Sequence, residues 1–170
     1  MLMETKENTE LLKRMREDMD TYNDKLKIIY EGFFSFAFMW SFGATLSEDR
    51  ISFNGSMRSL CKVKIPEGGM CFDYYFSPAT LQYEPWSDKV HSFSGDMGDL
   101  FQNVVVPTTE TTRQHYLIDV HRSIDKGLLY IGTAGTGKTT VFKDYFTILD
   151  QEKCASASMN FNSYTDSKAL

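Results

Sequence analysis

The residues Gly132 to Thr139 constrain this 170-residue chain more than any other stretch, because they read G-T-A-G-T-G-K-T. They match the phosphate-binding pattern G-x-x-x-x-G-K-[ST]. Glycine at Gly132, Gly135 and Gly137 lets backbone N–H groups approach phosphate oxygens with no Cβ in the way. Lys138 is expected to reach the outer phosphates, and the Thr139 hydroxyl is expected to bind Mg²⁺. The pattern therefore predicts a loop that holds a polyphosphate.

The residues on either side of this loop favour a binding loop over an ordinary glycine-rich turn. Leu128 to Ile131 form a short apolar run, which is typical of a buried parallel strand. After the loop, apolar residues recur at helical spacing from Val141 to Leu149. The N-terminus of that helix would direct its N–H groups and partial positive charge at the same phosphates. We therefore expect a strand, the loop and a helix in the order that phosphate binding requires.

Composition and charge argue against a nucleic-acid partner, and the cysteines and histidines show no pattern of a metal site. Hydrophobic residues make up 42% of the chain, so it can form a core, and a net charge of −5 with a pI of about 5.2 argues against a nucleic-acid partner. Cys61, Cys71 and Cys154 have no metal-site spacing and are expected to be buried thiols in a reducing compartment. The three histidines are scattered, and we expect them to have neither a metal nor an acid–base role.

The N-terminal part predicts helices. From Leu12 to Phe33 apolar residues step alternately by three and four, as in a heptad seam of about three repeats. Either this seam seeks a partner helix or it packs on its own domain, and we favour the second. Residues 28–46 are rich in aromatic residues and carry only Glu31 as a charge, but glycine and serine interrupt them. We expect a second, largely buried helix there that ends at Gly43, rather than a membrane span. Ser47 to Asp49 mark the start of another helix.

The middle of the chain predicts a β-hairpin. Phe72 to Phe76 and Leu81 to Trp86 are aromatic, β-prone runs, and the turn-forming quartet Ser77–Thr80 separates them. Pro85 would confine its strand to an edge. We expect the aromatic side chains to pack on neighbouring helices rather than to bind a ligand, and we expect 92–98 to be a polar loop.

A further α/β unit begins near Val104. Pro107 ends an apolar extended run, Thr108 is suited to cap a helix, and Lys126-Gly127 would close that helix. Within it, residues 116–119 superficially resemble an acidic strand but have helical spacing, and we expect a helix. Alternation of apolar and polar residues predicts a strand over 155–162.

With these pieces in order, the chain resembles part of a dynein heavy chain, from the end of the second AAA+ module to the start of the third. The agreement in order and spacing runs from about Ile28 onward. The segments that carry it are F-A-F-M-W-S-F-G at 36–43, F-D-Y-Y at 72–75, W-S-D-K-V at 86–90, V-P-T at 106–108 with Thr111 and Arg113, the loop at 132–139, and S-M-N-F-N at 158–162. The serine-rich segment at the end is closer to axonemal than to cytoplasmic dyneins.

The resemblance implies the site and its ligands. ATP or ADP with Mg²⁺ would bind at a regulatory third module, since in dyneins the main hydrolytic site lies in the first. Thr139 would be the metal-binding residue, and Val105, Val106 and Pro107 would lie near the adenine. The nucleotide-binding set is Gly132, Thr133, Ala134, Gly135, Thr136, Gly137, Lys138, Thr139 and Thr140.

The resemblance also implies partners and a place in the cell. The parent protein would be a minus-end-directed microtubule motor in the cytoplasm and cytoskeleton, with the axoneme of a cilium or flagellum favoured. Its partners would be the rest of the heavy-chain ring, microtubules, and dynein light and intermediate chains, but neither nucleic acid nor membrane.

Departures from the family limit the expected activity. No apolar strand ending in an acidic pair follows Lys138, and no arginine finger is recognisable, so we do not expect this chain to hydrolyse ATP alone and assign no catalytic residue. It would be an excerpt of a longer polypeptide or a truncated product. Another P-loop NTPase and a non-catalytic interaction fragment remain as alternatives.

The expected fold is α/β in three parts. A helical region over 1–62 would be the end of a preceding lid with connecting helices, and a β-hairpin and loop would follow over 63–103. Residues 104–170 would be the strand–loop–helix–strand portion of an incomplete AAA+ P-loop domain.

Overall fold

The computed structural model describes residues 6–93, 105–150, 152–162 and 164–166. Helices and one two-stranded antiparallel sheet make up its regular structure within these ranges. The chain divides into two compact units, Met1–Val90 and His91–Leu170, so the hairpin belongs to the same unit as the N-terminal helices. Among the described residues, no helix combines the length and apolar character needed to cross a bilayer.

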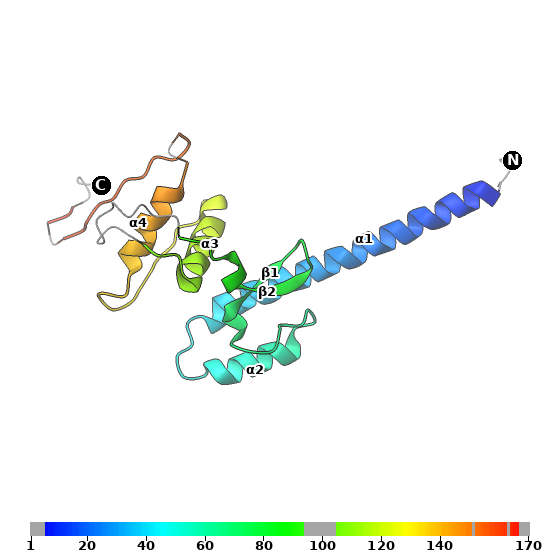
Figure 1. The fold of residues 1–170 in the computed structure, drawn as a ribbon, viewed down its shortest axis with the longest axis horizontal. Coiled ribbons are helices and arrows are strands. Elements are labelled where there is room, and N and C mark those ends of the chain that lie inside the picture. The colour runs from blue at the N-terminus through cyan, green and yellow to red at the C-terminus, as the bar shows by residue number, and fades with distance from the viewer. Residues whose placement is uncertain (1–5, 94–104, 151, 163, 167–170) are drawn as a thin grey trace. The chain divides into compact units, whose positions relative to one another are not determined.

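A single long helix dominates the first unit (Figure 1). Helix α1 runs without a break through Lys6–Phe38 and continues into a π-helix, η1, at Met39–Gly43. The expectation of two separate helices is therefore wrong, although Gly43 does end the helical segment as predicted. Gly32 lies inside α1 without interrupting it, and its lack of a side chain leaves room for the ring of Phe76, which packs directly against the helix there.

The aromatic half of α1 and η1 is only partly buried. Phe36 and Met39 are buried, but Phe34 and Phe42 are 72% and 61% exposed. Because 3.6 residues complete a turn, consecutive aromatic residues point in different directions, and a helix packed on one side leaves some of them outside. The expectation of a largely buried helix is thus wrong for one face.

Helix α2, Arg50–Leu60, follows the predicted start, with Asp49 as its N-cap residue. Arg58 then fixes the connection to the sheet by donating hydrogen bonds to the carbonyls of Ile65, Pro66, Gly68 and Gly69. Short 3₁₀ turns, η2 at Cys71–Asp73 and η3 at Trp86–Lys89, flank the hairpin.

The predicted hairpin is confirmed. Strand β1, Tyr74–Ser77, pairs antiparallel with β2, Gln82–Pro85, in the register that places Phe76 opposite Tyr83. The turn lies one residue later than predicted, because Ser77 belongs to β1 and Leu81 takes the left-handed conformation with φ of 60°. The backbone N–H of Leu81 donates to the carbonyl of Ser77 at 2.9 Å and closes the turn.

The hairpin packs its aromatic side chains on α1, as expected. The Phe76 ring meets those of Phe33 and Tyr83 at centroid distances of 5.2 and 5.6 Å, and Trp86 is fully buried. The Tyr83 hydroxyl donates to the carbonyl of Gly32 at 3.0 Å, and burial raises the pKa of this phenol well above its usual range. Helix and hairpin thus share one aromatic core.

The second unit contains α3, Thr109–Ser123, and α4, Lys138–Ile148. Thr108 caps α3 as predicted: its hydroxyl accepts from the N–H of Thr111 at 3.2 Å, and its own N–H donates to the Thr111 hydroxyl at 2.8 Å. Residues 116–119 are helical, as predicted. The helix ends at Ser123, ahead of Lys126-Gly127, since Asp125 takes a positive φ of 51° and turns the chain.

The strands predicted at Leu128–Ile131 and 155–162 are not formed in the described structure. Leu129 and Ile131 are 81% and 86% exposed, and Met159 and Phe161 are exposed as well. A strand is held by hydrogen bonds to at least one neighbouring strand, and the described part of this unit places no strand beside either segment. The helices of the expected α/β unit are present, whereas the described residues of this unit form no sheet.

Candidate functional site

The glycine-rich loop turns back on itself just before α4. Gly135 and Gly137 have φ values of 82° and 79°, a region that residues with a Cβ rarely enter. A Cβ added at either glycine would meet nothing within 4 Å, so the backbone conformation, rather than lack of space, requires glycine there. The loop residues 132–137 are exposed to solvent. The bend is therefore accessible and is shaped by its glycines.

The Lys138 ammonium lies inside this bend. Its Nζ donates to the carbonyl oxygens of Gly132 and Thr133 at 3.0 and 2.5 Å and to the Thr136 hydroxyl at 3.1 Å. The Thr136 hydroxyl in turn donates to the carbonyl of Thr133 at 3.0 Å. The motif predicts a lysine close to the loop, but it does not predict that the loop's own oxygens would hold the ammonium.

The N-terminus of α4 leaves several donors free of helical partners. Gly137 is its N-cap residue and provides no side-chain cap, and the first helical hydrogen bond runs from the N–H of Val141 to the carbonyl of Gly137 at 3.0 Å. The N–H groups of Lys138, Thr139 and Thr140 precede that bond and have no acceptor within the helix. They point out of the same end of α4 at which the lysine lies. A positive partial charge and one full charge thus coincide at an exposed loop.

Helix α3 supports α4 from one side through polar contacts that sequence reasoning missed. The Tyr145 hydroxyl donates to Asp119 Oδ1 at 2.8 Å and accepts from Arg122 Nε at 2.9 Å, and Arg122 also pairs with Asp119 at 2.9 Å. The hydrogen bond from Arg122 and then that from Tyr145 lower the pKa of the Asp119 carboxyl. Nearby, His115 Nε2 lies 3.3 Å from Asp144 Oδ2. The i, i+3 spacing of Asp119 and Arg122 signals only a surface pair, and nothing in it indicates Tyr145.

Tyr130 connects the residues before the loop to both helices. Its hydroxyl donates to Gln114 Oε1 at 2.5 Å, and its ring meets that of Phe142 edge-on at 4.9 Å. Burial raises the pKa of this phenol. The loop therefore enters from an anchored residue and leaves into an anchored helix, even though 128–131 form no strand.

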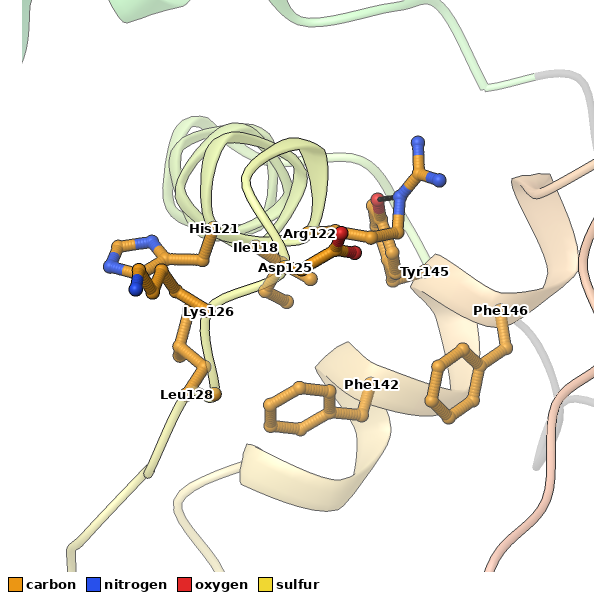
Figure 2. A pocket seen from close by; sticks show the side chains of 10 residues that line it. Ile118, His121, Arg122, Asp125, Lys126, Leu128, Phe142, Tyr145 and Phe146 are labelled. Atoms are coloured by element: carbon orange, nitrogen blue, oxygen red, sulfur yellow. Dashed lines mark hydrogen bonds between the residues drawn. The ribbon is translucent and has the colours of Figure 1, made fainter.

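A cavity of about 410 Å³ lies between α3 and α4 (Figure 2). Its apolar wall comes from Ile118, Leu128, Phe142 and Phe146, and its rim carries Arg122. None of the loop residues 132–140 lines it. The hollow is consequently separate from the phosphate-binding loop, which lies on the surface.

The remaining predicted residues lie as follows. Val105 and Pro107 are half-buried and Val106 is 56% exposed, all on the irregular lead-in to α3, and no described hydrogen bond joins them to the loop. Thr139 is exposed on the first turn of α4.

Cys61 and Cys71 are buried free thiols as predicted, but Cys154 is only half-buried, because its predicted strand is not packed in a sheet. No cluster of metal-binding side chains occurs among the residues that the structure covers.

Comparison with known proteins agrees with these motifs. Residues 94–170 match the family model for the P-loop containing dynein motor region, and residues 2–88 match that for the dynein heavy chain AAA lid domain. The chain is 38% identical to pig dynein axonemal heavy chain 11 over 87% of its length, and 34% identical to mouse dynein axonemal heavy chain 17 over 94%. It is 33% identical to the alpha chain of the flagellar outer arm dynein of Chlamydomonas reinhardtii over 81%.

The two family models meet between residues 88 and 94, close to the boundary between the compact units. The chain spans only 3% or 4% of the length of these relatives. Both halves nevertheless match dynein models, in the order that the resemblance predicted. The chain belongs to the dynein heavy chain family.

Proposed function

We propose that this chain supplies the nucleotide-binding loop of a regulatory AAA+ module, the third, in a dynein heavy chain. The observation that carries the proposal is the position of the Lys138 ammonium inside a glycine-shaped bend, at the N-terminus of α4. Phosphate oxygens would replace the carbonyls of Gly132 and Thr133 as partners of the ammonium and would accept from the free N–H groups of the helix.

The expected ligand is ATP or ADP with Mg²⁺. The pattern of the loop assigns the phosphates to residues 132–140 and the metal to the Thr139 hydroxyl, which is exposed at the start of α4. Val105, Val106 and Pro107 would cover the adenine. This chain's own part is to bind and orient the phosphates; we assign it no catalytic residue, and hydrolysis would need an acidic strand and an arginine from elsewhere.

The whole protein would be an ATP-driven, minus-end-directed microtubule motor. Its partners would be the rest of the heavy-chain ring, microtubules, and light and intermediate chains. The names of the axonemal and flagellar relatives support a place in a cilium or flagellum. Nucleotide bound by this chain would act as a regulator of that motor.

Titration of the full chain with a fluorescent ATP analogue and Mg²⁺ tests the proposal. Micromolar binding corresponds to about −8 kcal/mol. Lys138→Ala should weaken it by at least about 100-fold, since a charge-assisted contact to phosphate is lost. Lys143→Ala is the matched control, because Lys143 is exposed on the same helix and lies outside the loop. Equal affinities of the two variants would refute the assignment.

Thr139 provides a second, independent readout. Thr139→Val should abolish the increase in affinity that Mg²⁺ gives, whereas Thr139→Ser should retain it, because serine keeps the hydroxyl that binds the metal. An Mg²⁺ effect of the same size in both variants would exclude Thr139 as the metal-binding residue.

A non-catalytic interaction fragment is the second candidate. The observation that favours it is the exposed apolar face of α1, on which Leu12, Met15, Met19 and Tyr22 are each 57–62% exposed. A chain that binds no nucleotide but associates through this face would support the second candidate.

A further inference from the structure

Helix α3 is hydrogen-bonded to residues on both sides of the phosphate-binding loop. Before the loop, the Tyr130 hydroxyl donates to Gln114 Oε1 at 2.5 Å, two residues ahead of Gly132. After the loop, the Tyr145 hydroxyl donates to Asp119 Oδ1 at 2.8 Å, and Tyr145 belongs to α4, the helix into which the loop leads. Two tyrosine hydroxyls that flank the loop therefore bind the same helix.

Both hydroxyls remain hydrogen-bond donors at neutral pH. Tyr145 is 3% exposed, and its hydroxyl also accepts from Arg122 Nε at 2.9 Å (Figure 2). Burial and then the hydrogen bond to Asp119 raise the pKa of Tyr145, and burial raises the pKa of Tyr130. The two phenols consequently keep their protons, and with them the hydrogen bonds to α3.

The same helix begins directly after the segment 105–107. Thr108, the N-cap residue of α3, follows Pro107, and its reciprocal hydrogen bonds with Thr111 fix where the helix starts. The hydrogen bonds described for this unit thus connect the segment to the loop through α3, by way of Tyr130 and Tyr145. The position of one relative to the other depends on how α3 is held.

We propose that Tyr130 and Tyr145 are positioning residues, which act through α3 to fix the separation between the segment 105–107 and the phosphate-binding loop. They would adapt the site to a ligand that carries both a base and a polyphosphate. The inference rests on the proposed function, in which 105–107 would cover the adenine. We assign neither tyrosine a contact with the nucleotide.

The form of the loop itself comes from local contacts. The positive φ angles of Gly135 and Gly137 and the three hydrogen bonds of Lys138 Nζ all involve residues 132–138. A ligand made of phosphates alone would contact only the loop and the start of α4, so it would bind equally well wherever these lie relative to α3. ATP would need one arrangement, and its apparent affinity would fall with the fraction of molecules that adopt it.

Calorimetric titration of the full chain with ATP and with tripolyphosphate, both with Mg²⁺, tests the proposal. Tyr130→Phe and Tyr145→Phe each remove one hydroxyl and keep the ring, and each should weaken ATP binding by about threefold to tenfold. Neither change should alter the affinity for tripolyphosphate. Asp119→Ala combined with Tyr145→Phe should weaken ATP binding no more than the larger single effect, because both changes remove the same contact.

Two further variants make the test specific. Tyr164→Phe is the matched control, because Tyr164 is 91% exposed in the same unit, and it should change neither affinity. Lys138→Ala should weaken the binding of both ligands, so it reports on the proposed function separately from the positioning role. Far-UV circular dichroism verifies that each variant keeps its helices.

The outcomes separate the two ideas. Equal losses for ATP and tripolyphosphate in the two tyrosine variants would overturn the inference and leave the nucleotide site standing, since the hydroxyls would then shape the loop itself. Unchanged ATP affinity in both variants would overturn it as well, and so would an unmodified chain that binds ATP but not tripolyphosphate. An ineffective Lys138→Ala would refute the proposed function, and the inference with it.

Discussion

Gly32 and Gly55 offer a paired test of how α1 packs on the hairpin. Both are glycines inside helices, and alanine is favoured over glycine there by about 1 kcal/mol. A Cβ at Gly55 would meet nothing within 4 Å. A Cβ at Gly32 would lie 2.5 Å from Cζ of Phe76, and nearer still to two other atoms of the same ring. Identical substitutions should therefore change stability in opposite directions.

The magnitudes follow from these contacts. Gly55→Ala should stabilise the first unit by about 1 kcal/mol, since only helix propensity changes. At Gly32 the same gain is opposed by overpacking, which typically costs about 1–3 kcal/mol. The Phe76 ring is 2% exposed and lies against Phe33 and Tyr83, so it cannot move aside. We place the cost at the top of that range, about 3 kcal/mol, and after the gain of about 1 kcal/mol in helix propensity we expect Gly32→Ala to destabilise the unit by about 2 kcal/mol.

Urea unfolding followed by tryptophan fluorescence measures both effects. Trp40 and Trp86 are the only tryptophans, and both lie in the first unit, so the signal reports that unit alone. In a Phe76→Leu background the penalty of Gly32→Ala should shrink, because the smaller side chain vacates the overlap. If Gly32→Ala proves as stabilising as Gly55→Ala, the close packing of helix on hairpin described above is wrong.

Three further predictions concern single groups. Thr108→Ala should destabilise α3 by about 1 kcal/mol in thermal unfolding followed by circular dichroism, because the reciprocal cap with Thr111 is lost; no change would exclude the cap. The pKa of Asp119 is lowered in the folded state, so its contribution is present above the ordinary carboxyl pKa of about 3.9 and is lost on acidification through the lower folded pKa. Asp119→Asn should therefore flatten the acid limb of the stability curve of the second unit, and an unchanged limb would refute that reasoning. Burial raises the pKa of Tyr83, so the first unit should lose stability as pH rises above about 10, where the unfolded phenol ionises; in Tyr83→Phe this part of the alkaline loss should be absent.

Elements fixed by neighbouring residues could be predicted from the sequence. The hairpin forms where two aromatic runs flank Pro78, and the α3 cap forms at Thr108, because turn and cap chemistry depends on a few adjacent residues. The turn was predicted one residue too early, since nothing in the sequence shows that Leu81 adopts a positive φ. The loop at 132–139 also takes its form locally, through Gly135 and Gly137.

Features that depend on distant partners could not be predicted in this way. Leu128 to Ile131 have the composition of a buried strand, but a strand exists only where another lies beside it. The seam over 12–33 and the aromatic-rich stretch over 28–46 differ in composition and were therefore interpreted as two helices, whereas one helix continues through both. The hydrogen bond from Tyr145 to Asp119 likewise joins two helices, so it cannot be predicted before the packing of α3 on α4 is known.

The π-helix at Met39–Gly43 lies where the chain leaves α1 and turns toward α2. Met39 and Gly43 are both buried, and Gly43 lies so close to α2 that a Cβ there would be 2.7 Å from Cζ of Phe53. Five residues of this wider turn rotate the chain about as far as four residues of an ordinary α-helix would. Deleting one residue from it would therefore restore the ordinary helical pitch and leave Gly43 facing Phe53. The π-helix thus accommodates one additional residue without changing the direction in which the chain passes from α1 to α2, and a one-residue deletion there should be less damaging than the same deletion in the middle of α1.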